Sequence, residues 1–178
     1  GGLACVLTFE RVTAPTRMGI DVMPSLVLAI EVGQQFNPHG RLVFYPGSPA
    51  LAMTMARPQD RLRLFELHPA DFEALERTFA GETERVQCRK ADGFTGLKSL
   101  LPPLSRRALV LIDPSYEIKD DYRKVVDCVK DAMRRFPTAP YAVWSPLLAR
   151  PEARHLPPRL SDLGAQSWLA LRLAVRRP

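Results

Sequence analysis

The feature that most constrains the fold of this chain is an alternation of apolar and amphipathic segments, which begins at Arg41. Segments whose apolar residues are continuous or alternate predict strands, and segments whose apolar residues recur every three or four positions predict helices. The predicted strands span residues 41–45, 60–68, 85–93, 106–116, 138–148 and 167–176, and the predicted helices span residues 48–56, 69–80, 96–102, 119–136 and 157–166. This order is typical of an α/β fold with a mostly parallel sheet and helices on both faces.

The first forty residues do not follow this pattern. Residues 6–13 are compatible with a strand, and residues 25–36 predict a helix that ends at the turn-forming residues 37–40. A length of 178 residues is typical of one domain. We therefore expect a core at residues 41–178, preceded by a divergent or incomplete segment at residues 1–40.

The composition indicates a basic protein of the soluble class. The chain is 46% hydrophobic and 25% charged, which is ordinary for a globular protein. No apolar run is long enough to span a bilayer, and the first residues lack the basic start and cleavage site of a secretory signal. We therefore expect a cytoplasmic protein without membrane contacts. The net charge of +6 and the pI near 9.6 favour a polyanionic partner. A solvated basic surface that binds no nucleic acid is the alternative.

The cysteines and histidines give no sign of a metal site. Cys5, Cys88 and Cys128 are far apart in the sequence and form no Cys-x-x-Cys pair. Three reduced thiols in a cytosolic protein are the expected state. The three histidines form no paired set either, so we predict no bound metal.

Three of the predicted strands end on an acidic residue, namely Glu66, Asp92 and Asp113. In open parallel sheets, ligands bind beyond the carboxyl ends of the strands, which is where these side chains are expected. A carboxylate at such a position commonly accepts hydrogen bonds from the hydroxyls of a ribose, and Glu66 is the natural candidate. A helix cap or an ion pair is the alternative for Glu66.

Other residues near the strand ends have a possible ligand role and a structural alternative. Asp92 could accept from the exocyclic amine of an adenine while Gly93 lets the ring approach the backbone, or the pair is an ordinary turn. Ser48 and the free amides at a helix start could hold a ligand carboxylate, or Ser48 is a simple N-cap. His68 is interpreted as a loop residue rather than a base.

The segment "DPSY" at residues 113–116 is the most specific signal, because it follows the most apolar strand of the chain. It resembles the Asp/Asn-Pro-Pro-Tyr/Phe motif of amino-methyltransferases that act on an exocyclic nitrogen of adenine or cytosine. Such an amine is a poor nucleophile, because its lone pair is delocalised into the ring. The carboxylate of Asp113 and the carbonyl of Pro114 can accept from this amine and aim its lone pair at a sulfonium methyl group, while Tyr116 stacks on a flipped base. A chance acidic turn is the alternative.

Several segments in order are similar to the bacterial 23S rRNA (adenine-N6)-methyltransferase family, which uses S-adenosylmethionine. They are "FNPHGRLVFYPGSPALA", "RPQDRLRLFELHPADFEAL", "ADGFTGLKSLLPP", "RRALVLIDPSYEIKDDY" and "YAVWSPLL". The resemblance runs from about Phe36 to Pro178. It implies a Rossmann-like class I methyltransferase sheet, with residues 41–178 as part of the catalytic core. It also implies S-adenosylmethionine as the cofactor, protein-free 23S ribosomal RNA as the partner, no metal, and a monomer.

The resemblance assigns roles to individual residues. The cofactor-binding residues that it implies are Ser48, Glu66 for the ribose, and Asp92 and Gly93 for the adenine side. The catalytic residues that it implies are Asp113, Pro114 and Tyr116.

The sequence also departs from the family pattern. The amino-terminal motif with His and Lys, the glycine-rich cofactor loop and the final strands of the family are not recognised in it, and Ser115 replaces the second proline. Three hypotheses therefore stay open. The chain is an active methyltransferase of 23S rRNA, an inactive truncated remnant that at most binds RNA, or a DNA adenine-N6 methyltransferase.

Overall fold

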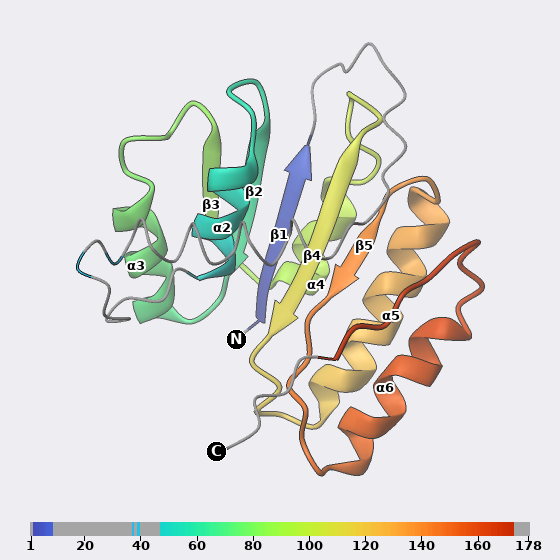
Figure 1. Cartoon of the computed structure of the whole chain (residues 1–178). Coiled ribbons are helices and arrows are strands. Elements are labelled where there is room, and N and C mark those ends of the chain that lie inside the picture. Colours follow the sequence, from blue (N-terminus) through green and yellow to red (C-terminus); the bar gives the residue numbers. More distant parts are fainter. Residues whose placement is uncertain (1, 9–36, 38, 40–46, 173–178) are drawn as a thin grey trace.

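The computed structural model describes residues 2–8, 37, 39 and 47–172, and for residues 2–8 it describes the backbone. Figure 1 shows these elements as one sheet with helices packed against it. In chain order they are β1 (Gly2–Thr8), α2 (Ser48–Met55), β2 (Arg61–Glu66), α3 (Pro69–Thr78), β3 (Val86–Lys90), α4 (Gly93–Gly96), the 3-10 helix η1 (Leu97–Ser99), β4 (Ala108–Pro114), α5 (Asp120–Arg135), β5 (Tyr141–Val143) and α6 (Pro151–Ser161).

The described strands form one sheet in the order β3-β2-β1-β4-β5. β2 pairs in parallel with β3, and β4 pairs in parallel with β5. β1 lies between β2 and β4 and is antiparallel to both. The expected α/β fold is therefore found, and β2, β3, β4 and β5 all point in one direction. Four of the five described strands are parallel to one another, as expected, but a full Rossmann-like sheet is not shown, because the central described strand is reversed.

The physical reason for this difference lies in the connections. A helix between two adjacent strands requires a crossover and therefore parallel pairing, which fixes the direction of β3 relative to β2 and of β5 relative to β4. The apolar pattern of a strand is the same in either chain direction, and both parallel and antiparallel pairing satisfy the backbone N–H and C=O groups. The sequence of β1 therefore could not set its own direction.

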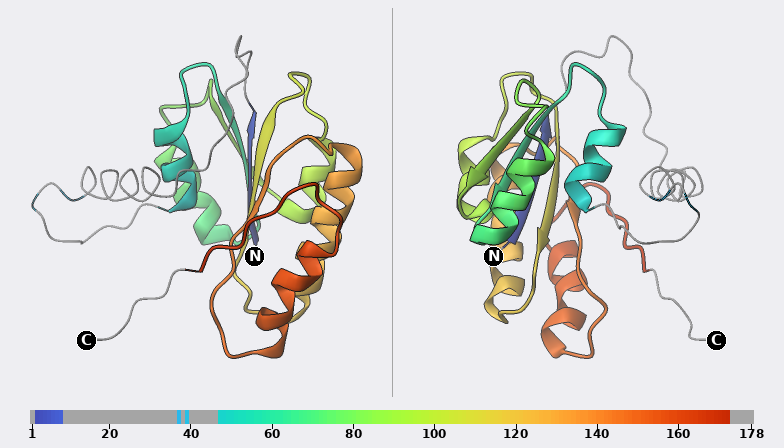
Figure 2. Two further views of the ribbon diagram at one scale, coloured as in Figure 1. Left: turned by 45° about the vertical axis from the view of Figure 1, so that its right-hand side comes forward. Right: turned by 90° about the vertical axis from the view of Figure 1, so that its left-hand side faces the viewer.

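The alternation of side chains along β4 divides the core into two layers. Ala108, Val110 and Ile112 of β4 belong to a buried cluster that includes the inner faces of α5 and α6. Leu109 and Leu111 face the other way and pack against a cluster that contains Leu62 and Leu64 of β2 with residues of α2 and α3. The two further views accordingly show α2 and α3 on one side of the sheet and α4, α5 and α6 on the other (Figure 2).

Helix α5 provides the main cover of one face. Its residues Tyr122, Val125, Val126 and Val129 are buried, and Met133 packs against the same cluster. These are the residues that the spacing of three and four positions predicted to face inward. Full burial of each such apolar side chain contributes about 1.5–3 kcal/mol, so this face anchors the helix on β4.

Three predicted elements near the carboxyl end need correction. The strand expected over 138–148 is limited to β5, and the helix expected over 157–166 begins already at Pro151 and contains two prolines. Residues 167–172 form no strand and are exposed, because none of the described strands lies beside them to satisfy a ladder. The strand considered over 6–13 coincides with β1 only at residues 6–8, because β1 begins already at Gly2. The predictions for 9–13, 25–36, 41–45 and 173–176 lie outside the described residues. Among the described helices, none has the length and apolar character needed to cross a membrane.

Candidate active site

The register of the sheet places Glu66 and Asp113 at the same level. Ala4 of β1 pairs with Phe65 on one side and with Ile112 on the other. Glu66 and Asp113 are the next residues of their strands, and with one strand between them their backbones lie about 10 Å apart. Both side chains continue the rows that face α2 and α3, because they alternate in step with the core residues of β2 and β4.

Asp92 joins this edge from the neighbouring strand. Lys90, the last residue of β3, pairs with Glu66, and Asp92 follows two positions later. The carboxyl ends of three parallel strands thus bring three acids of distant sequence to one edge of the sheet. This edge is the place where open α/β sheets bind their ligands.

Asp113 is half-buried at the end of β4 and has a partner from a distant part of the chain. Its Oδ2 accepts a hydrogen bond of 3.2 Å from the hydroxyl of Ser48. Burial raises the pKa of Asp113, and the hydrogen bond from Ser48 opposes this shift by stabilising the ionised form. The carboxylate is therefore a partly desolvated acceptor.

Ser48 can reach Asp113 because it is not the residue that caps α2. The N-cap is Gly47, and Ser48 is the first residue of the helix, followed by Pro49. The sequence predicted Ser48 as the N-cap, which is wrong by one position. The hydroxyl of Ser48 makes no cap bond and donates across to β4 instead.

The turn after Asp113 is held in an unusual conformation. Tyr116 has a φ of 54°, in the left-handed region that costs a residue with a Cβ about 1–2 kcal/mol. Its hydroxyl donates to the carbonyl of Trp144 at 2.8 Å, and its own carbonyl accepts from Nη1 of Arg150 at 3.2 Å. Its ring centroid lies 4.6 Å from that of Tyr122. These contacts hold the backbone that follows Asp113 and Pro114 in place.

The burial of Tyr116 bears on its predicted role. Its side chain is 1% exposed, and burial, followed by the nearby Tyr122 and Asp113, raises its pKa, so the hydroxyl stays protonated. Pro114 is buried as well. In this structure the ring of Tyr116 is therefore a packing element of the turn, and stacking on a base would require the ring to be uncovered.

Glu66 is the most enclosed of the three acids, with 8% exposure. Its Oε1 accepts a hydrogen bond of 2.8 Å from the backbone N–H of His68. A carboxylate has about four acceptor positions, so this one bond leaves others for ligand hydroxyls. His68 is exposed and lies before α3 as its N-cap residue, with Nδ1 3.2 Å from Oδ2 of Asp71.

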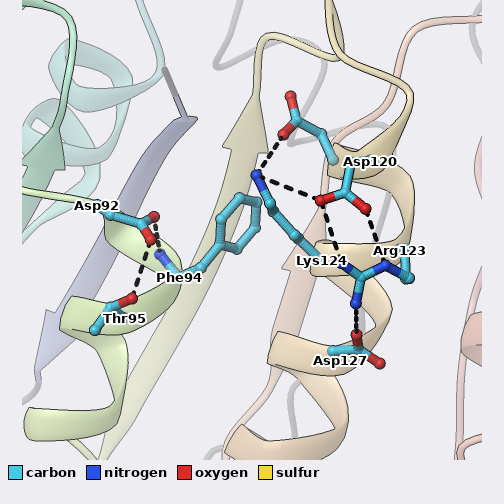
Figure 3. Close-up of polar contacts among 8 residues, drawn as sticks. Asp92, Phe94, Thr95, Asp120, Arg123, Lys124 and Asp127 are labelled. Carbon is cyan, nitrogen blue, oxygen red and sulfur yellow. Dashed lines mark hydrogen bonds and ion pairs between the residues drawn. The ribbon is translucent and has the colours of Figure 1, made fainter.

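Asp92 is exposed and forms the N-cap of α4 (Figure 3). Its Oδ1 accepts from the backbone N–H of Phe94 and its Oδ2 accepts from the hydroxyl of Thr95, both at 3.0 Å. Gly93 is the first residue of α4 and is buried. The pair is thus a helix start, so the simple Asp-Gly turn considered from the sequence is not what forms here.

Two residues of this region were not recognised from the sequence. Trp144 and Arg150 lie 28 and 34 positions after Tyr116 and contact it through a backbone carbonyl and a guanidinium. No local pattern marks a carbonyl acceptor, and Arg150 is one of many arginines. Only the placement of the segment after β5 beside the end of β4 reveals them.

A depression of about 510 Å³ lies near the starts of α5 and α6, beside Tyr122. Its charged walls are largely paired: Lys119 lies 3.4 Å from Glu152, and Arg123 lies 2.9 Å from Asp120 and 3.0 Å from Asp127, as Figure 3 shows for α5. We assign the candidate site to the acid edge because the sheet register brings three acids of distant sequence together there, and the hydrogen bond from Ser48 to Asp113 joins residues 65 positions apart. Within the part of the chain that the structure describes, no three His, Cys, Asp or Glu residues gather closely enough to hold a metal ion.

A family model described as "Ribosomal RNA large subunit methyltransferase D, RlmJ" matches residues 19–178. The match covers most of the chain and includes every residue of the candidate site. The chain belongs to this family. The resemblance inferred from its motifs is thereby confirmed.

Two curated relatives carry the name "Ribosomal RNA large subunit methyltransferase J". The one from Escherichia coli (strain K12) is 43% identical over 155 residues, which are 87% of this chain and 55% of the relative. The one from Haemophilus influenzae is 38% identical over 157 residues, which are 88% of this chain and 56% of the relative. The chain therefore spans about half the length of these relatives.

The fold also has a counterpart of known structure. A crystal structure of a Legionella pneumophila protein matches with a TM-score of 0.71 at 30% sequence identity. The match covers 89% of this chain and 62% of that chain. The described sheet and helices are thus an architecture found in an experimentally determined structure.

Proposed function

We propose that this chain carries the target-amine site and part of the cofactor site of a methyltransferase. The enzyme would transfer a methyl group from S-adenosylmethionine to N6 of an adenine in 23S ribosomal RNA. The observation that carries the proposal is the half-buried Asp113 at the end of β4, at the same level of the sheet as Glu66. Membership of a ribosomal RNA methyltransferase family supports the reaction class.

The role of Asp113 follows from the chemistry of an exocyclic amine. An ionised carboxylate accepts an N–H of the amine, and the Pro114 carbonyl accepts the other, which favours a tetrahedral nitrogen with an available lone pair. The hydrogen bond from Ser48 supports the ionised form of Asp113 in a site where burial disfavours it. S-adenosylmethionine, when bound, supplies the electrophilic methyl group.

The cofactor would be held by residues at the carboxyl ends of β2 and β3. Glu66 has acceptor positions left for the ribose hydroxyls, and Asp92 with Gly93 would face the adenine at the start of α4. Both oxygens of Asp92 already accept one hydrogen bond each, and each retains a second acceptor position. This set of acceptors therefore fits the hydroxyl and amine donors of a nucleoside, and Ser48 would assist through its contact with Asp113 or with the cofactor.

The remaining features of the proposal come from the family and the charge. The partner would be protein-free 23S RNA in the cytoplasm, attracted by the net charge of +6, and the protein would act as a monomer. Tyr116 would stack on the target base once its ring is uncovered. A DNA adenine-N6 methyltransferase would share the same motif, and competition between ribosomal RNA and duplex DNA separates the two substrates.

A second candidate function is that of an inactive module that only binds RNA. The observation that favours it is the 1% exposure of Tyr116, whose ring is not available to a base in this conformation. Calorimetric titration with S-adenosylmethionine discriminates between the two. Binding that is weakened by Glu66→Ala supports the methyltransferase, whereas no binding supports the module.

The decisive experiment is a radiolabelled methyl-transfer assay on unmodified 23S ribosomal RNA. We expect Asp113→Ala to reduce incorporation about 10²–10³-fold, because it removes an acceptor that aligns the amine. Asp162→Ala, which removes an exposed acid at the end of α6, is the control and should retain full activity. Equal incorporation by the two variants would exclude the assigned role of Asp113.

A further inference from the structure

The face of the sheet opposite Glu66 carries a group of arginines at its β2–β3 end. Leu64 of β2 and Val86 of β3 point into the cluster beneath α3. Side chains alternate along a strand, so Arg61, Arg63 and Arg89 point to the other face. We call these three residues the sheet-face arginines. Arg89 is exposed, and Arg61 and Arg63 are half-buried.

The parallel register brings the sheet-face arginines close together. Arg63 pairs with Gln87, and Phe65 pairs with Arg89, so Arg63 and Arg89 are diagonal neighbours about 8 Å apart. This separation is comparable to the screening length of physiological salt. Burial, and then the charges of Arg89 and Arg61, lower the pKa of Arg63. The three positive charges therefore act on one another.

Arg63 and Arg89 have no acidic partner among the residues that the structure describes. The guanidinium of Arg63 donates to the carbonyl of Leu62 at 3.1 Å, and that of Arg89 donates to Oε1 of Gln87 at 3.2 Å. A guanidinium carries five N–H donors, and each of these two arginines uses one of them in the hydrogen bond given above. Neutral acceptors do not balance the like-charge repulsion, which costs stability unless an anion binds there.

Among the described residues, the positions of the helices leave part of this surface uncovered. Helix α4 contacts β1 and β2 on this side, and the Phe65 ring lies against Gly96 at the end of α4. Helices α5 and α6 cover β4 on the same side of the sheet. The described helices thus leave the sheet-face arginines beyond their edge, where Arg89 reaches solvent.

We propose that the sheet-face arginines dock the sugar–phosphate backbone of the RNA substrate. The planar guanidinium matches two phosphate oxygens, and several phosphates in sequence match several arginines on adjacent strands. Such contacts position the RNA and carry no sequence information, so the choice of adenine stays with the acid edge. The identity of the polyanion as RNA rests on the proposed function.

The test compares two double variants of equal charge. Arg63→Gln with Arg89→Gln removes two charges from the sheet face. Arg134→Gln with Arg154→Gln removes two charges from the exposed faces of α5 and α6, where no ion pair is recorded for either residue. The affinity of each for a 23S ribosomal RNA transcript is measured by filter binding across a series of salt concentrations.

We expect the sheet-face variant to bind RNA about tenfold more weakly and to lose about 1–2 units of the slope of log K against log salt. The helix variant should stay within about twofold of the parent. Arg63→Lys with Arg89→Lys keeps the charge and should retain most of the slope. If this lysine variant binds RNA nearly as well as the parent, the weaker binding of the glutamine variant comes from the lost charge and not from a change of residue at these positions. Equal losses in the two glutamine variants, or no loss in either, would overturn the proposal.

A separate measurement keeps this proposal distinct from the proposed function. Calorimetric binding of S-adenosylmethionine should be the same in the parent and in the sheet-face variant, since the arginines lie on the face opposite Glu66. If the parent binds no S-adenosylmethionine, the proposed function fails while the RNA comparison can still be made. If the parent binds S-adenosylmethionine and the two glutamine variants bind RNA equally well, only the proposal of an RNA-docking surface fails.

Discussion

The ends of β3 and β4 carry the same sequence feature, an acid at the end of a strand, in two different environments. Asp113 is half-buried, and its recorded hydrogen bond comes from Ser48, 65 positions away. Asp92 is exposed, and its two recorded bonds come from residues two and three positions later. Asp92 thus stabilises a helix start with both of its oxygens, whereas Asp113 is partly desolvated, accepts from one distant donor and has more acceptor positions left for a ligand.

The difference teaches that burial, and not the strand-end position alone, decides what an acid can do. The turn after Asp113 is fixed by Tyr116, whose ring and hydroxyl connect it to α5 and to the segment after β5. The turn after Asp92 is fixed by the cap itself. The β4 end therefore depends on tertiary packing, and the β3 end depends on a local helix start.

The largest effect on stability is expected at the β4 end. Tyr116→Ala should lower the free energy of unfolding by about 3–5 kcal/mol, because it leaves a cavity beside Tyr122 and an unpaired carbonyl at Trp144. Urea denaturation followed by circular dichroism measures the change. Tyr116→Phe keeps the ring and should recover more than half of the loss, and a variant as stable as the parent would contradict the anchoring role.

A smaller effect is expected from the packing beneath the β3 end. Gly96→Ala should lower the free energy of unfolding by about 1–3 kcal/mol, since its Cβ would overlap three carbons of the buried Phe65 ring. Gly81→Ala is the matched control, because nothing lies within 4 Å of its Cβ position. Thermal unfolding of both variants measures the difference, and equal midpoints would contradict the close contact.

Alanine variants of Asp92 and Asp113 should differ in their effects on stability, because Asp92 caps a helix and Asp113 is assigned to the active site. Asp92→Ala should cost about 1 kcal/mol, the usual value for the loss of an N-cap side chain. Asp113→Ala should cost less in stability, because it removes a carboxylate that burial disfavours, although it should lower the proposed activity about 10²–10³-fold. Urea denaturation of the two variants tests this. A larger loss of unfolding free energy for Asp113→Ala than for Asp92→Ala would contradict the prediction.

The smallest effect concerns pH. The pKa of Asp113 is raised above its ordinary value of 3.8 in the folded chain, so the folded state holds this proton more tightly than the unfolded state. Its contribution to stability is therefore greatest below the ordinary value and declines as pH rises through the raised pKa. Asp113→Asn removes this dependence. Stability profiles of the parent and this variant from pH 3 to 7 should differ in slope only between the ordinary value and the raised pKa, and profiles that are parallel throughout would exclude the shift.

Much of the fold was predictable because its determinants are local. The spacing of Tyr122, Val125 and Val129 specifies the inner face of α5, and the apolar run of residues 108–112 specifies a buried strand. The helix crossovers then fix the parallel pairing of neighbouring strands. The prediction failed at residues 167–172, where an alternating pattern is present but no described strand pairs with it.

The candidate site was predictable only as a set of residue types. The motif at Asp113 and the acids at Glu66 and Asp92 could be selected from the sequence, and their roles remain proposals. The sequence could not indicate that Ser48 donates to Asp113 or that Trp144 accepts from Tyr116, since these pairs are separated by 65 and 28 positions. Contacts of this kind depend on how the elements pack.

The amino-acid sequence by itself determined where most of the described helices and strands lie, which faces they bury, and the family to which the chain belongs. The tertiary structure alone decided the reversed direction of β1, the burial of Tyr116 and the shared level of Glu66 and Asp113 in the sheet. The physical reason is that periodicity and capping act over a few residues, whereas register, burial and desolvation arise only when distant segments come together.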